Sequence, residues 1–191
     1  HAGPHPRPRP LHRGVRGRPE PFARDRDARA VTTRAKCTGA LDRAAEGAVR
    51  ACFSCAGQLC VSSERVYVAA PVRFEFQLRF VVRVRGIRLG AAYDYSCDVG
   101  SLVSQEQLDK VIRHVGDAVA NGANVVTGGS RRPDLGPWFF EPTVLEGVRP
   151  GMLVADEETF GPVVAMYSVA DDAAAVAAAN ATSYGLNASV W

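Results

Sequence analysis

Residues 104–127 read SQEQLDKVIRHVGDAVANGANVVT, and this stretch predicts a capped helix that is followed directly by a strand. Ser104 and Gln107 have the spacing of a capping box at a helix start. Gly122 suits the left-handed residue that often ends a helix. Between them, one apolar face recurs at helical spacing, formed by Leu108, Val111, Ile112, Val115, Ala118 and Val119. The apolar run at residues 125–127 then predicts a short buried strand.

The same alternation of helix and strand continues on both sides of this stretch. Two more helices are predicted, over residues 41–53 with Asp42 as the cap and over 172–180 with Asp171 as the cap. Four more strands are predicted, at residues 64–68, 139–145, 163–169 and 186–191. Because helices that alternate with strands are typical of α/β proteins, we expect an α/β fold.

Residues 73–89 carry two conflicting patterns. Apolar residues alternate with charged and polar ones from Phe74 onward, and this period of two slightly favours a strand. Phe76, Phe80 and Val84 also lie at helical spacing, and a proline just upstream suits a helix start. From the residues alone, the strand is the slightly better interpretation.

Residues 1–40 differ in composition from the rest of the chain. The first 35 hold nine Arg, six Pro and three of the four His, with a net charge of +6 against +3 for the whole chain. Such a segment buries too little apolar surface to offset its ordering entropy, so we predict a disordered or non-native leader. Two alternatives stay open: a basic arm for nucleic acid or anionic lipid, and a GC-rich coding region translated out of frame.

The remaining residues carry a net charge of −3, which argues against nucleic-acid binding. No apolar run approaches the roughly 18 residues of a transmembrane helix, and the first residues do not resemble a secretion signal. Five cysteines are an odd number, which argues against a disulfide framework and for reduced thiols. We therefore expect a cytoplasmic protein without a membrane or nucleic-acid partner.

Cys60 ends the segment FSCAGQLC at residues 53–60, between a predicted helix and a predicted strand. A cysteine at such a junction can face a cleft with its backbone N–H free, as a thiolate nucleophile and an oxyanion require. Spacing alone nevertheless fits a buried structural thiol better. Cys52 and Cys55 have zinc-ligand spacing, but no second Cys or His pair follows, so no metal is expected.

Four segments resemble, in the family's order, signatures of the aldehyde dehydrogenase superfamily: Gly57–Cys60, Phe139–Leu145, Glu157–Val163 and Asn180–Leu186. The resemblance covers residues 41–191, which we expect to form a partial aldehyde dehydrogenase catalytic domain. It implies an incomplete α/β catalytic domain with a mostly parallel sheet, and it makes residues 73–89 a helix. Within the family, the overall character of the sequence, and not any single diagnostic residue, is most similar to bacterial succinate-semialdehyde dehydrogenases.

The resemblance also implies roles for individual residues. Cys60 matches the nucleophile that attacks an aldehyde carbonyl, and its backbone N–H matches one oxyanion donor. Glu158 matches the glutamate that binds the nicotinamide ribose hydroxyls, and Phe160 matches the aromatic residue beside the nicotinamide. The implied reaction oxidises an aldehyde, with succinate semialdehyde as the suggested substrate, to a carboxylic acid with NAD or NADP. Intact family members pair through sheet edges, which implies a homo-oligomer.

A second hypothesis comes from a different class of function. No Gly-rich phosphate loop precedes Cys60, and the general-base glutamate of the family has no match in the chain. Cys55 stands where the family usually has Asn, and Ser54 stands where well-known succinate-semialdehyde enzymes have Arg. The alternative is therefore a non-catalytic truncated or frameshifted remnant.

Overall fold

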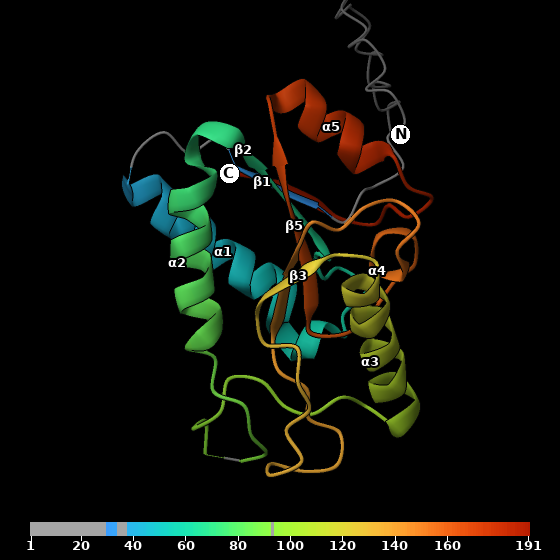
Figure 1. The fold of residues 1–191 in the computed structure, drawn as a ribbon. Helices are drawn as coiled ribbons and strands as arrows, with labels where there is room; N and C mark the ends of the chain where they lie inside the picture. Colours follow the sequence, from blue (N-terminus) through green and yellow to red (C-terminus); the bar gives the residue numbers. More distant parts are fainter. Residues whose placement is uncertain (1–29, 34–37, 93) are drawn as a thin grey trace, which may run out of the picture.

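The computed structural model describes residues 30–33, 38–92 and 94–191. In this part of the chain, one sheet has the strand order β3-β4-β5-β2-β1-β6, and helices cover both of its faces (Figure 1). The strands are β1 (Ala30–Thr33), β2 (Arg65–Ala69), β3 (Asn124–Thr127), β4 (Thr143–Glu146), β5 (Val163–Val169) and β6 (Ala188–Val190). Only β3 pairs antiparallel among these described strands. The predicted α/β fold with a mostly parallel sheet is confirmed.

The α-helices are α1 (Thr38–Phe53), α2 (Arg73–Arg85), α3 (Gln105–Ala120), α4 (Leu153–Asp156) and α5 (Asp172–Asn180). Two 3₁₀ turns join them to the sheet: η1 (Ser54–Gly57) follows α1, and η2 (Ala70–Val72) precedes α2. None of the helices in the described ranges is both long and apolar enough to cross a bilayer.

The central strands are apolar on both faces because helices cover both sides of the sheet. On β2, Val66 and Val68 pack with α1 and α2, whereas Tyr67 points to the opposite face. There, the Tyr67 ring stacks on Tyr167 with centroids 5.2 Å apart, and its hydroxyl donates to the Ala178 carbonyl on α5 at 3.1 Å. This alternation is the period of two that a strand buried on both faces requires.

The helix over residues 41–53 is confirmed, but the predicted cap is wrong. Helix α1 begins at Thr38, so Asp42 lies inside the helix. Its carboxylate instead accepts a hydrogen bond from Arg83 at 2.8 Å and lies 3.4 Å from the Arg79 guanidinium. Asp42 therefore links α1 to α2. On the same helix, Gly47 leaves room for the Trp191 indole, which a side chain at this position would overlap.

Residues 73–85 are a helix, as the family resemblance implied and against the period of two. Phe76, Phe80 and Val84 are buried, and the rings of the two phenylalanines lie 5.6 Å apart. Phe74, Leu78 and Val82 lie on another face of α2, where they are 78%, 57% and 60% exposed. The alternating pattern arises because this helix carries apolar residues on two faces, and only one of them packs against the sheet.

Both other predicted helices are confirmed together with their caps. The Ser104 hydroxyl accepts from the Gln107 N–H at 3.2 Å, and the Asp171 carboxylate accepts from the Ala174 N–H at 2.8 Å. The reciprocal half of the predicted capping box is replaced by another contact. The Gln107 side chain reaches instead to the carbonyls of residues 159 and 160.

The strand predictions are correct in place but not in every detail. The strands at residues 64–68 and 163–169 are confirmed as β2 and β5. β3 lies at the sheet edge and is exposed or half-buried, so the prediction of a buried strand at 125–127 is wrong. β4 starts later than predicted, at Thr143, because residues 139–142 form a loop with buried Phe139.

The leader prediction for residues 1–40 falls largely outside the described residues. Within that span, residues 30–33 form β1, which pairs with β2 and β6, and α1 begins at residue 38. The predicted boundary at residue 40 thus falls inside α1, and for the rest of the span the disordered or non-native leader stays a prediction.

Candidate active site

Cys60 lies in an exposed turn between η1 and β2. Side chains from other parts of the chain hold this turn in place. The Gln58 side chain accepts from the Val103 N–H at 2.9 Å, and the Asn187 side chain donates to the Val61 carbonyl at 2.9 Å. Among the described residues, none accepts a hydrogen bond from the Cys60 N–H. The thiol is thus accessible on a fixed loop, and its N–H remains available as a donor.

The backbone that leads into this turn is strained. Three successive residues, Cys55 (φ 52°), Ala56 (φ 57°) and Gly57 (φ 69°), adopt the left-handed conformation. This conformation costs roughly 1–2 kcal/mol for a residue with a Cβ. Backbone strain of this kind concentrates at functional sites, where surrounding contacts must hold it in place.

Gly57 packs directly against Gly161, and this contact joins the first and third signature segments. A Cβ on Gly57 would overlap the carbonyl oxygen of Gly161. A Cβ on Gly161 would in turn overlap the side chain of Val111 on α3. Only glycine fits at both positions, so the cysteine loop and the segment of residues 157–163 lie in backbone contact.

Glu158 and Phe160 lie in the loop between α4 and β5, and both are half-buried. Glu158 lines a small pocket whose other lining residues come from three parts of the chain: Glu64, Arg65, Val154, Ala155, Glu157, Thr182 and Tyr184. Phe160 has a left-handed backbone with φ 54°. The structure therefore places Glu158 with the segments that follow Cys60 and α5, although Cys60 itself does not line this pocket.

Two residues behind this loop escaped the sequence reasoning. Glu64 lies four residues after Cys60, and its carboxylate accepts from the Thr159 N–H at 2.9 Å and the Phe160 N–H at 2.8 Å. His114 is buried on α3, with its Nδ1 3.1 Å from the Thr159 hydroxyl. The sequence offered two signals for them: a histidine on the apolar face of a predicted helix and an acid at the start of a predicted strand. Neither signal indicates which residue the side chain contacts.

The metal alternative finds no support in the described residues, which contain no cluster of three or more metal-ligating side chains. Cys52 is buried on α1, and burial, reinforced by the nearby Glu64 charge, raises the pKa of its thiol well above the usual range. Cys55 and Cys60 are exposed. The three cysteines thus have different environments, and Cys52 is an inert core thiol.

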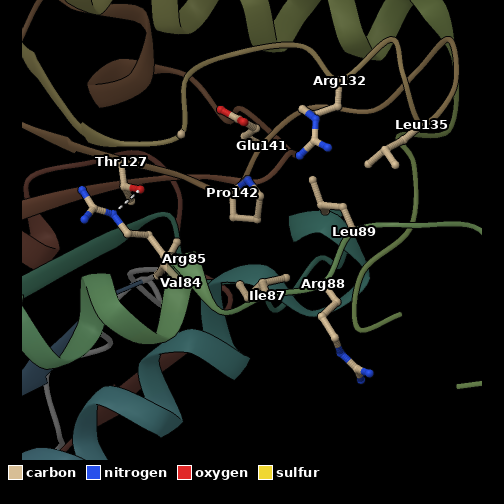
Figure 2. A pocket seen from close by; sticks show the side chains of 11 residues that line it. Val84, Arg85, Ile87, Arg88, Leu89, Thr127, Arg132, Leu135, Glu141 and Pro142 are labelled. Atoms are coloured by element: carbon tan, nitrogen blue, oxygen red, sulfur yellow. Dashed lines mark hydrogen bonds between the residues drawn. The ribbon is translucent and has the colours of Figure 1, made fainter. Parts of the chain in front are cut away.

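A second pocket lies between the end of α2 and the loop around Glu141 (Figure 2). Three arginines line it, and two of them already pair with acids: Arg88 with Asp98 at 2.7 Å and Arg132 with Asp134 at 2.8 Å. Arg85 donates to the Thr127 hydroxyl at 3.2 Å. None of the three predicted site residues lines this pocket.

The chain belongs to the aldehyde dehydrogenase family, because the model of that family matches residues 35–191. All four segments that resemble signatures of the family lie inside this matched range.

The most informative relatives carry names from one branch of the family. A Mycobacterium tuberculosis protein, named provisionally as an NADP(+) succinate-semialdehyde dehydrogenase 2, is 58% identical over 151 residues, which are 79% of this chain and 29% of that protein. A Sinorhizobium fredii protein with a similar provisional name is 44% identical, over 78% of this chain and 30% of its own length. The chain therefore spans less than a third of the length of these relatives.

Solved structures agree on the fold. Succinate-semialdehyde dehydrogenase from Burkholderia pseudomallei aligns with a TM-score of 0.78 at 36% identity, over 86% of this chain and 34% of that one. Betaine aldehyde dehydrogenase from Staphylococcus aureus, in complex with NAD+, aligns with a TM-score of 0.79 at 30% identity, over 86% of this chain and 33% of that one.

Proposed function

We propose that this chain is the nucleophile-bearing part of an NAD(P)+-dependent aldehyde dehydrogenase, with Cys60 as the nucleophile. The observation that carries the proposal is the backbone contact of Gly57 with Gly161. It brings the loop that carries an exposed thiol into backbone contact with the segment that carries Glu158 and Phe160. The names of the relatives support succinate semialdehyde as the substrate.

In the proposed reaction, the Cys60 thiolate adds to the aldehyde carbonyl carbon and forms a C–S bond. The carbonyl oxygen becomes an oxyanion, which the Cys60 backbone N–H stabilises; removing one such donor costs about 3 kcal/mol of barrier in comparable enzymes. NAD(P)+, when bound, supplies the acceptor for the hydride that leaves this carbon. The resulting thioester reacts with water, which releases the carboxylic acid and returns the thiol.

The residues of the loop fit a nicotinamide nucleotide in their chemistry. The Glu158 carboxylate can accept hydrogen bonds from ribose hydroxyls, and it lines a pocket beside Arg65 and Tyr184. The Phe160 ring offers an apolar surface for a planar heterocycle. These roles are proposals for the two residues.

The proposal also covers location and assembly. Exposed free thiols suit a reducing compartment, so we place the protein in the cytoplasm. The exposed apolar stripe of Phe74, Leu78 and Val82 on α2 supports a homo-oligomer, because such a stripe gains stability when a second copy covers it.

The test is a purified-chain assay for aldehyde-dependent NAD(P)H formation at 340 nm, with Cys60→Ala as the variant and Cys97→Ala as the matched control. Activity that Cys60→Ala abolishes and Cys97→Ala retains supports the proposal. If neither the wild-type chain nor any variant shows activity, the result favours the non-catalytic alternative. Iodoacetamide labelling adds a second readout: we expect Cys60 to be alkylated well before the buried Cys52.

A further inference from the structure

The backbone of Phe160 is held in a conformation that it would not adopt by itself. Its φ of 54° lies in the left-handed region, which is an outlier for a bulky side chain. The cost is on the order of 1–2 kcal/mol, so neighbouring groups must fix it. The adjacent contact of Gly57 with Gly161 restrains the chain on one side of Phe160 only.

Glu64 binds the N–H groups of this segment. Its two carboxylate oxygens take one donor each, the Thr159 N–H at 2.9 Å and the Phe160 N–H at 2.8 Å. The Glu64 backbone is itself fixed, because its carbonyl accepts from the Ala165 N–H of β5 at 2.9 Å. One acid therefore ties the segment to the start of the central strands, next to the cysteine turn.

Gln107 binds the carbonyl groups of the same two residues. Its side-chain amide donates to the Thr159 carbonyl at 2.9 Å and to the Phe160 carbonyl at 2.8 Å. Gln107 lies in the first turn of α3, whose start is capped by Ser104. Both peptide donors and both peptide acceptors of residues 159 and 160 are thus bound by two side chains from separate elements.

We infer that Glu64 and Gln107 are positioning residues, which hold Phe160 in its left-handed conformation so that its ring and Glu158 meet the nicotinamide end of the cofactor. The cofactor part of this inference rests on the proposed function. Neither residue touches the reacting atoms. Their contribution is the fixed geometry of the loop, which lowers the ordering cost of binding.

Two isosteric variants test the inference. Glu64→Gln turns one acceptor oxygen into an NH₂ group that faces an N–H, and Gln107→Glu turns the amide donor into a carboxylate that faces two carbonyls. The matched controls are Glu46→Gln, at an exposed residue that pairs with Arg50 on α1, and Gln77→Glu, at a half-buried glutamine of α2.

The first measurement is hydrogen exchange of single backbone amides. In both test variants, we expect the Thr159 and Phe160 amides to exchange about tenfold faster, since each loses a hydrogen bond or its restraint. The Ala165 amide, which binds the Glu64 backbone carbonyl, should keep its rate and so report that the fold is intact. Unchanged exchange at Thr159 and Phe160 in a folded variant would overturn the inference.

The second measurement is NADP+ and NAD+ affinity by saturation-transfer NMR. We expect the dissociation constant to rise about fivefold in the test variants and to stay unchanged in both controls. If the wild type binds and the variants bind equally well, the inference is wrong. If the wild type binds neither nucleotide, the proposed function fails, and hydrogen exchange alone decides whether the two residues hold the loop. Should Glu64→Gln fail to fold, Gln107→Glu and Glu64→Asp provide the same readouts.

Discussion

His114 and Thr159 meet inside the protein, with the imidazole Nδ1 3.1 Å from the hydroxyl oxygen and neither residue more than 2% exposed. The other ring nitrogen lies 3.5 Å from the Glu157 carboxylate, which is longer than a good hydrogen bond. Burial lowers the pKa of His114, the nearby Lys110 lowers it further, and Glu157 opposes both. The imidazole is therefore neutral in the folded protein near pH 7.

The first prediction concerns acid stability. Because the pKa of His114 is lower in the folded than in the unfolded chain, the unfolded chain takes up the extra proton. The stabilisation is complete above the unfolded pKa of about 6.5 and is lost as the pH falls through the folded value. Urea denaturation at pH 7.5, 6.5 and 5.5 should show a declining free energy of unfolding, and His114→Gln should flatten the decline. An equally steep decline in the variant would assign the effect to other groups.

The second prediction concerns Cys55, whose left-handed backbone suits asparagine better than cysteine. We expect Cys55→Asn to raise the free energy of unfolding by about 1 kcal/mol, since asparagine tolerates this conformation at lower cost. Cys55→Val should lower it, because a β-branched side chain is disfavoured there. Denaturant unfolding of both variants and the wild type measures these differences in the free energy of unfolding. Equal stability of the two would show that residue 55 carries no strain.

The third prediction separates the two glycines at the contact between the signature segments. Gly57→Ala should cost about 3 kcal/mol, because its Cβ meets a backbone oxygen and its φ is positive. The Cβ of Gly161→Ala would overlap the Val111 side chain, with Leu102 at ordinary contact distance, so Val111→Ala should relieve part of the cost of Gly161→Ala.

A double-mutant cycle on unfolding free energies measures this relief. We expect Gly161→Ala and Val111→Ala to couple by about 1 kcal/mol. The combination of Gly57→Ala with Val111→Ala should be additive instead. Coupling of the same size in both cycles would contradict the packing of Gly161, and not of Gly57, against the Val111 side chain.

The fourth prediction concerns assembly through α2. Leu78→Glu places a charge in the middle of the exposed apolar stripe and should shift an oligomer toward the monomer, as light scattering after gel filtration can show. Gln77→Glu, at the neighbouring half-buried position, is the matched control. A wild-type chain that is already monomeric at high concentration would refute self-association through this stripe.

Much of the fold follows from local sequence signals. The caps at Ser104 and Asp171 and the apolar run of residues 163–169 each predict an element that the structure confirms. The failures have a common physical reason. The sheet-edge position of β3 and the second apolar face of α2 depend on what lies opposite them, and spacing along one segment carries no information about that.

The candidate site could be predicted only in part. The positions of Cys60, Glu158 and Phe160 came from a resemblance, and the structure adds an exposed thiol and a half-buried loop. The groups that fix this loop, Glu64 and Gln107, bind it across 95 and 52 residues of sequence. Such pairings arise from the register of the sheet and the docking of α3, so no local pattern reveals them.

The indole of Trp191 lies over Gly47 of α1. It gives the protein an optical reporter, because tryptophan emission shifts when the ring moves from a protein surface into water. Detachment of β6 from the sheet edge would expose this ring while the core around Phe80 stayed intact. In a Trp138→Phe variant, where Trp191 is the one remaining tryptophan, fluorescence read beside far-ultraviolet circular dichroism would then separate fraying of that edge from global unfolding.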